Sequence, residues 1–212
     1  MIEGIIFDMD GVLADTEHFY QQRRENYLRE KQFVYDAEMD FVGSNEKAIW
    51  EAIVPDDPVL CRQMLLEYRE YRAAHPEPYE KLVDPQVKPL FEELKRRGLK
   101  IGIASSSERT AIEAMMKAAG VTELVDYCIS GVECSTHKPD PEIYLKAMEK
   151  LGLNTANAFA VEDSATGIAA ALNAGLRVYA LKPRHGERID QSAATAVIGQ
   201  LKDVLERLDE RI

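Results

Sequence analysis

The chain lacks any long run of apolar residues, and this absence narrows the possibilities first. No apolar stretch in its 212 residues approaches the roughly 20 residues that a membrane-spanning helix requires. The N-terminus also lacks a basic region followed by a long apolar run, which is the pattern of a secretory signal. We therefore expect a cytoplasmic protein with no membrane partner.

Positive charge and cysteine are also scarce. The chain has 26 Lys and Arg against 37 Asp and Glu, which gives a formal net charge of −11. Such a chain is a poor match for nucleic acid or an anionic membrane, although local cations can still hold a small anionic substrate. The three cysteines have no Cys-x-x-Cys spacing, so we expect reduced thiols that pack as small hydrophobic residues.

Strand and helix patterns alternate from about residue 86 onward. Helical spacing covers 89–97, 108–119, 141–151 and 165–174, and each of these segments is followed by a glycine. Apolar strand patterns cover 100–104, 127–130, 158–161, 177–181 and 196–198, and a last helix is expected at 201–208. Strands that alternate with helices of this length predict right-handed βαβ units and a parallel α/β sheet.

Residues 16–80 depart from this alternation. They are polar, rich in Tyr, Glu and Arg, and have helical patterns at 17–31, 46–53 and 59–74. The simplest interpretation is a helical insert between the first strand and the rest of the sheet. We expect the single tryptophan, Trp50, to lie in the core of this insert.

Polar side chains follow the strands at four places. They are Asp8 and Asp10 after the first strand, Ser105-Ser106-Ser107 after the second, Lys138 before a helix, and Glu162-Asp163 after a later strand. The carboxyl ends of parallel strands meet at one edge, where open α/β sheets bind their ligands. Each group alone has a simpler interpretation, such as a turn, a helix cap or a solvated lysine. Together they favour a site in which carboxylates hold Mg²⁺ and a hydroxyl and a cation hold a phosphoryl group.

These segments resemble the four motifs of the haloacid dehalogenase superfamily. The motifs are Phe7-Asp8-Met9-Asp10-Gly11-Val12, Ala104-Ser105-Ser106-Ser107, Lys138-Pro139-Asp140-Pro141 and Val161-Glu162-Asp163-Ser164. Asp15-Thr16-Glu17 and the segment from Glu162 to Ile168 are similar to the β-phosphoglucomutase-like branch. The resemblance implies a three-layer, Rossmann-like parallel-sheet core of residues 1–14 and 82–212, with an α-helical cap at 15–81.

The resemblance also implies a mechanism. Asp8 would attack phosphorus to form an aspartyl-phosphate, and Asp10 would protonate the leaving alcohol and then activate water. The implied phosphate-binding side chains are Ser105, Ser106 and Lys138, and the implied Mg²⁺ ligands are Asp8, Asp10 through its main-chain carbonyl, Glu162 and Asp163. The expected partner is a small phosphorylated metabolite, and the protein is expected to be a monomer or a weak dimer.

The resemblance leaves open a phosphatase or a β-phosphoglucomutase-type mutase. A mutase must hold a second phosphate in its cap, but ungapped matching puts Tyr20, Glu46 and Glu67 where such mutases have His, Arg and Lys. This favours a phosphatase acting on a sugar phosphate. The cap cations that remain are Lys47, Arg69, Arg72 and His75, which we expect to form a solvated helix face.

A signalling receiver domain is a further alternative, because receivers also carry a phosphorylated Asp, a hydroxyl residue and a Lys on a parallel sheet. A receiver has no need of a second acid two residues after the first, nor of a large insert over the site. The loop at 182–186, which contains Arg184 and His185, has two possible positions, at the rim of the site or in solvent, and we expect it to face solvent.

Overall fold

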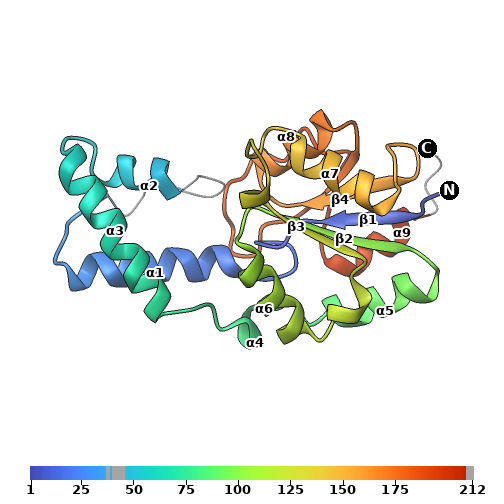
Figure 1. Ribbon diagram of the computed structural model, residues 1–212, viewed down its shortest axis with the longest axis horizontal. Coiled ribbons are helices and arrows are strands. Elements are labelled where there is room, and N and C mark those ends of the chain that lie inside the picture. Colours follow the sequence, from blue (N-terminus) through green and yellow to red (C-terminus); the bar gives the residue numbers. More distant parts are fainter. Residues whose placement is uncertain (37–38, 40–45, 209–212) are drawn as a thin grey trace. The chain divides into compact units, whose positions relative to one another are not determined.

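The computed structural model describes residues 1–36, 39 and 46–208, and the chain divides into two compact units (Figure 1). One unit comprises Met1–Asp15 and Tyr79–Ile212, and the other comprises Thr16–Pro78. The expected boundaries, after residue 14 and before residue 82, lie close to these division points. The assignment of the larger unit as catalytic core and of the helical unit as cap stays a prediction.

Within the described residues, the larger unit contains a sheet of six parallel strands. They are β1 (Gly4–Phe7), β2 (Lys100–Ser105), β3 (Tyr127–Ser130), β4 (Ala158–Glu162), β5 (Arg177–Leu181) and β6 (Ala196–Ile198), in the order β3-β2-β1-β4-β5-β6. The chain runs outward from β1 through β2 and β3 and then returns to β4 on the other side of β1. Open α/β sheets bind ligands at the carboxyl ends of the strands beside such a switch point.

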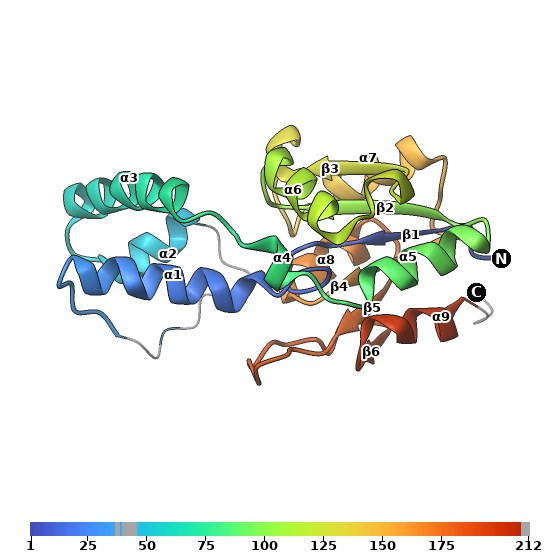
Figure 2. The same cartoon turned by 90° about the horizontal axis from the view of Figure 1, so that it is seen from below.

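Helices cover both faces of this sheet, which confirms the predicted three-layer α/β fold (Figure 2). One face carries α5 (Val87–Arg96), α6 (Arg109–Ala119) and α9 (Val204–Arg207), and the other carries α7 (Glu142–Leu151) and α8 (Ala165–Asn173). Side chains alternate between the two cores along β1, because successive residues of a strand point to opposite faces. Ile5 and Phe7 join the first core, and Ile6 joins the second.

The four expected stop glycines all have the positive φ that is typical of the position directly after a helix. Gly120 follows α6 with φ of 65°, and Gly152 follows α7 with φ of 62°. A residue with a Cβ adopts this left-handed conformation at a cost, so glycine is favoured directly after a helix. These glycines help to place the following strands back in the sheet.

The C-terminal helix differs from its expected form. The segment 201–208 is a 3₁₀ turn, η3 (Leu201–Asp203), followed by the short helix α9. The Asp203 carboxylate accepts hydrogen bonds from the backbone N–H groups of Gly199 and Gln200, which closes a capping box around this turn. A further short helix that the pattern did not predict, α4 (Tyr79–Leu82), begins directly after the helical unit.

The helical unit has its own aromatic core. It contains α1 (Thr16–Glu30), α2 (Glu46–Ile53) and α3 (Pro58–Ala74). Trp50 is 1% exposed and its ring centroid lies 5.7 Å from that of Tyr27 and 5.2 Å from that of Tyr68. The prediction that Trp50 is a core residue is therefore confirmed. Asp57 caps α3 by accepting hydrogen bonds from two backbone N–H groups of its first turn.

The three cysteines are free thiols, as expected. Cys61 is buried in the core of the helical unit, and Cys128 and Cys134 pack partly buried against the cores of the larger unit. In the described part of the chain, no helix has the length and apolar character that crossing a membrane would need.

The loop at 182–186 faces solvent only in part: His185 is exposed, as expected, whereas Arg184 is half-buried. Arg184 donates a hydrogen bond to the carbonyl oxygen of Val12 (2.8 Å) and pairs with Asp84 (3.1 Å). The His185 ring nitrogen Nε2 lies 2.7 Å from the carboxylate of Asp15. The loop therefore contacts the larger unit close to the points where the chain leaves it and returns. Contacts between segments so far apart in sequence depend on the fold and have no local pattern.

Candidate active site

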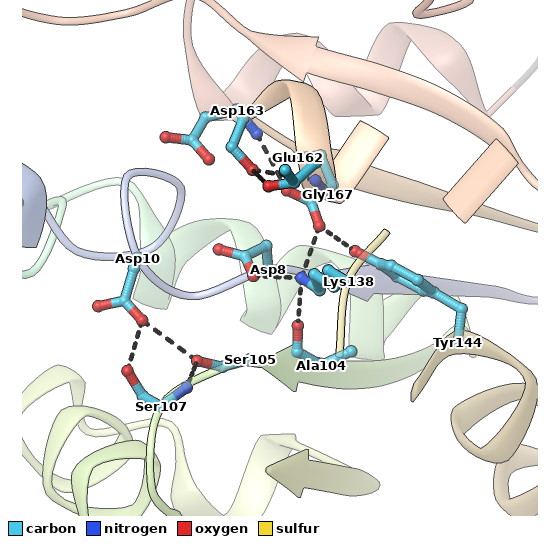
Figure 3. Close-up of polar contacts among 12 residues, drawn as sticks. Asp8, Asp10, Ala104, Ser105, Ser107, Lys138, Tyr144, Glu162, Asp163 and Gly167 are labelled. Atoms are coloured by element: carbon cyan, nitrogen blue, oxygen red, sulfur yellow. Dashed lines mark hydrogen bonds and ion pairs between the residues drawn. The ribbon is translucent and has the colours of Figure 1, made fainter. Parts of the chain in front are cut away.

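The ends of β1, β2 and β4 and the loop before α7 bring the predicted polar residues to the carboxyl edge of the sheet (Figure 3). Asp8 directly follows β1, and its backbone N–H donates to the carbonyl oxygen of Val161 in β4 (2.9 Å). Ser105 is the last residue of β2 and Glu162 is the last residue of β4. Asp10 lies in the tight turn that follows β1. The sheet itself thus places these side chains, because the strands are parallel and in register.

Three carboxylates form a buried acidic cluster at this edge. Asp8, Glu162 and Asp163 each offer one oxygen, and these atoms all lie within 4.8 Å of one another. The three residues are 6%, 0% and 7% exposed, respectively. The carboxylate of Asp10 is not part of this cluster, and its predicted role as a ligand rests on its main-chain carbonyl, which stays a prediction.

Lys138 lies against this cluster and uses its ammonium donors fully. Its Nζ lies 2.6 Å from Oδ1 of Asp8, 2.6 Å from Oε1 of Glu162 and 3.0 Å from the carbonyl oxygen of Ala104. An ammonium group has three N–H donors, so these three acceptors account for all of them. The predicted position of Lys138, reaching this edge from the loop before α7, is where the structure places it.

The buried carboxylates and Lys138 shift one another's pKa values. Burial raises the pKa of the Asp8 carboxyl, Lys138 lowers it in part, and Glu162 raises it again, so that the pKa lies well above its usual range. Burial lowers the pKa of Lys138, but Asp8 and Glu162 outweigh burial and hold that pKa well above its usual range. Lys138 thus pairs with two of the three buried carboxylates, Asp8 and Glu162. A divalent cation would balance this charge, and an all-oxygen set of ligands is what Mg²⁺ prefers.

Tyr144 on α7 is a site residue that sequence reasoning missed. Its hydroxyl donates to Oε1 of Glu162 at 2.5 Å, and its ring centroid lies 5.1 Å from Nζ of Lys138. The residue is fully buried. Its position on the apolar face of a helix is typical of core packing, so the pattern contained no signal of a polar contact.

The serine run divides into residues with different surroundings. Ser105 is buried, and its Oγ donates to Oδ2 of Asp10 at 3.2 Å. Ser107 also donates through Oγ to Oδ2 of Asp10, at 2.7 Å, whereas Ser106 is exposed. The structure therefore brings Ser105 and Ser107 to Asp10. The phosphate-binding roles predicted for Ser105 and Ser106 stay predictions.

Two glycines leave room for the acidic cluster. A Cβ on Gly11, whose φ is 77°, would lie 1.8 Å from Oδ2 of Asp163. A Cβ on Gly167, in the first turn of α8, would lie 2.1 to 2.3 Å from the carboxylate atoms of Glu162. Both distances are far shorter than van der Waals contact, so the carboxylates occupy space that any other residue would fill.

The substitution Gly167→Ala is expected to push the Glu162 carboxylate out of the cluster. Metal affinity depends on the positions of the ligands and of the residues that hold them. We therefore expect Mg²⁺ to bind about 10–100-fold more weakly, as measured by titration calorimetry. Gly199→Ala is the matched control, since its Cβ would meet its nearest neighbour at an ordinary 3.5 Å. Unchanged affinity in Gly167→Ala would contradict the role given to this cluster.

Three of the four candidate cap cations form ion pairs on the surface of the helical unit. Glu46 pairs with Arg69 at 2.8 Å and with Arg72 at 3.6 Å, and Lys47 pairs with Glu51 at 3.6 Å. The fourth candidate, His75, stacks on the ring of Tyr71. These contacts agree with the expected solvated helix face. Glu46 thus pairs with two of the four candidate cations.

Residues 5–181 match the family model of the haloacid dehalogenase-like hydrolases. The chain is 28% identical to a phosphorylated carbohydrates phosphatase of Thermotoga maritima, over 96% of this chain and 100% of that protein. It is 29% identical to SUPPRESSOR OF QUENCHING 1, a chloroplastic protein of Arabidopsis thaliana, over 93% of this chain but only 19% of that longer protein. A solved structure of β-phosphoglucomutase from Clostridium difficile shares the fold, with a TM-score of 0.76 and 22% identity over 99% of this chain and 98% of that one.

Proposed function

The chain belongs to the haloacid dehalogenase-like hydrolases, and we propose that it is a Mg²⁺-dependent phosphatase that hydrolyses a small phosphorylated metabolite of the sugar-phosphate class. The observation that carries this proposal is the buried contact of Asp8 with Lys138 beside two further acids. The similarity to a phosphatase named for phosphorylated carbohydrates supports the substrate class.

Asp8 is the proposed nucleophile, which attacks phosphorus and forms an aspartyl-phosphate. Phosphate monoesters hydrolyse very slowly in water, and a covalent intermediate divides one difficult step into two easier ones. Asp10 gives a proton to the leaving alcohol and then takes one from the attacking water. The hydrogen bonds of Asp10 with Ser105 and Ser107 place this second acid beside the end of β2.

Lys138 and Ser105 hold the transferring group. Lys138 already contacts Asp8, so a phosphoryl group on Asp8 would lie within reach of the same ammonium. Asp8, Glu162 and Asp163, with the main-chain carbonyl of Asp10, would hold Mg²⁺. When bound, Mg²⁺ would supply positive charge against the phosphoryl oxygens and against the crowded carboxylates.

The alternative activity is that of a β-phosphoglucomutase-type mutase, in which a second sugar hydroxyl replaces water. The solved mutase structure shares the fold alone at 22% identity. The ion pairs of Glu46 with Arg69 and Arg72 favour the phosphatase, because a mutase needs cap cations that are available for a second phosphate.

The proposed function predicts release of inorganic phosphate from hexose, pentose or triose phosphates in the presence of Mg²⁺. Removal of Mg²⁺ with a chelator is expected to abolish this release, and added Mg²⁺ is expected to restore it, because the acidic cluster would lose its counter-charge. Each reaction is also examined for isomerised sugar phosphate. Full activity in the chelator would contradict metal dependence, and isomerisation without phosphate release would identify a mutase.

A further inference from the structure

Ser107, in the loop between β2 and α6, joins the ends of three strands. Its backbone N–H donates to Oγ of Ser105 at 3.0 Å, and its own Oγ donates to Oδ2 of Asp10 at 2.7 Å. Its carbonyl oxygen accepts a hydrogen bond from Oγ of Ser130 at 2.6 Å. All three polar groups of Ser107 are thus engaged, and each one points to a different strand end.

Ser130, the last residue of β3, is fully buried and is itself held in place. Its backbone N–H donates to Oε1 of Glu133 at 3.1 Å. Glu133 in turn pairs with Arg109, the first residue of α6, at 2.8 Å. The segment from Ser107 to Arg109 is therefore held at one end by the last residue of β3 and at the other by the turn that follows β3.

These contacts hold Ser107, whose hydroxyl donates a hydrogen bond to the carboxylate of Asp10. An Asp side chain has two rotatable bonds, and proton transfer requires its carboxylate within a narrow range of distance and angle from the reacting oxygen. Figure 3 shows the Asp10 carboxylate turned toward Ser107 and Ser105. Ser107 makes the shorter hydrogen bond to this carboxylate, at 2.7 Å, whereas that of Ser105 is 3.2 Å.

We propose that Ser107, anchored by Ser130, is a positioning residue that orients the carboxylate of Asp10 for proton transfer. The inference rests on the proposed function, in which Asp10 protonates the leaving alcohol. Ser105 is less suited to this task, since its proposed role in holding the phosphoryl group would compete for its hydroxyl. Ser107 serves Asp10 without a phosphate-binding role of its own in the proposed mechanism.

The test compares two substrates that differ in their need for a proton. A sugar phosphate loses an alkoxide that must be protonated, whereas p-nitrophenyl phosphate loses a stable phenolate. Release of each leaving group is measured in a single turnover with excess enzyme and Mg²⁺, so that only the first step is observed. The variants are Ser107→Ala, Ser107→Thr and Ser130→Ala, and Ser135→Ala in an exposed loop is the matched control.

Ser107→Ala is expected to slow release of the alcohol from the sugar phosphate about 10–100-fold, with little change in apparent substrate affinity. This loss is a fraction of the rate enhancement that a general acid provides. The effect of Ser107→Ala on p-nitrophenyl phosphate is expected to be several-fold smaller. Ser130→Ala should show the same selectivity, and Ser107→Thr should restore the rate because it keeps the hydroxyl. The control should match the wild type, and melting temperatures verify that each variant is folded.

Two results would overturn the inference while the proposed function stands. In the first, the wild type is active and Ser107→Ala releases the leaving group at the same rate. In the second, Ser107→Ala loses the same factor in rate on both substrates, which would indicate general damage to the site. An inactive wild type on both substrates would overturn the proposed function and the inference with it.

Discussion

Replacement of Asp8 by asparagine is expected to abolish phosphate release, with a fall in kcat of at least ~10⁴-fold, the order seen when an enzyme loses its nucleophile. The neutral amide cannot attack phosphorus or carry an acyl-phosphate. The fold should persist, because asparagine has nearly the same shape and Lys138 keeps its contacts with Glu162 and Ala104. Removal of one of three crowded acids relieves repulsion, so the melting temperature without Mg²⁺ should be unchanged or higher.

The measurement is steady-state phosphate release, paired with mass spectrometry of acid-quenched enzyme. The wild type should gain the mass of one phosphate during turnover, and the Asp8→Asn variant should not. Asp56→Asn, in the exposed turn between α2 and α3, is the matched control and should behave as the wild type. Substantial activity in Asp8→Asn, or a covalent phosphate that persists in it, would rule out Asp8 as the nucleophile.

Much of the fold follows from local pattern. The predicted strands at 127–130, 177–181 and 196–198 coincide with β3, β5 and β6, because short apolar runs between polar or glycine-containing turns have few alternatives in a buried sheet. The glycines after the helices marked the returns to the sheet. The 3₁₀ turn at Leu201–Asp203 could not be foreseen, since it depends on which carboxylate caps which N–H group.

The polar residues of the site were predictable for a topological reason. Asp8, Ser105 and Glu162 come at the ends of strands, and parallel strands put such ends on one edge whatever their order in the sheet. What the pattern could not provide is the set of contacts that depend on packing between elements. Tyr144 reaches Glu162 because α7 packs on the sheet face that β2 and β3 form, and its place on an apolar helix face marked it only as core.

The same limit applies to Ser107 and Ser130. Ser107 belonged to a serine run whose members could not be told apart in the sequence, and only the fold shows which hydroxyls meet Asp10. Ser130 is separated from Ser107 by a helix, and its hydrogen bond requires that β2 and β3 be neighbours in register. Local pattern thus identifies side chains that are capable of catalysis or binding, and packing determines which of them contact one another.

Lys138→Met is expected to lower the free energy of unfolding by about 3–5 kcal/mol at neutral pH without Mg²⁺, and to abolish activity. Methionine is similar in length and apolar, so the main change is the loss of the ammonium between Asp8 and Glu162. Both carboxylates would then be buried without their counter-charge. Lys146→Met is the matched control, because Lys146 also pairs with a glutamate, at 2.6 Å, but is 40% exposed and should matter little.

The dependence on pH gives this prediction a definite sign. The folded state raises the pKa of Lys138, so its pairing stabilises the wild type at every pH below the ordinary lysine value and is lost only as the pH rises above it. The folded state also raises the pKa of Asp8, so a proton can replace the missing ammonium as the pH falls. The difference in stability between wild type and Lys138→Met should therefore shrink as the pH falls from neutral toward the ordinary range of an aspartate.

A double-mutant cycle separates charge from packing. If the cost of Lys138→Met comes from unpaired buried acids, then adding Glu162→Gln removes one of those acids and should recover part of the stability, with a coupling of about 0.5–3 kcal/mol. Additive effects, or a cost that does not change with pH, would mean that the lysine acts through packing alone. In that case the charge deficit inferred for the site, and with it the main physical reason to expect a divalent cation there, would have to be abandoned.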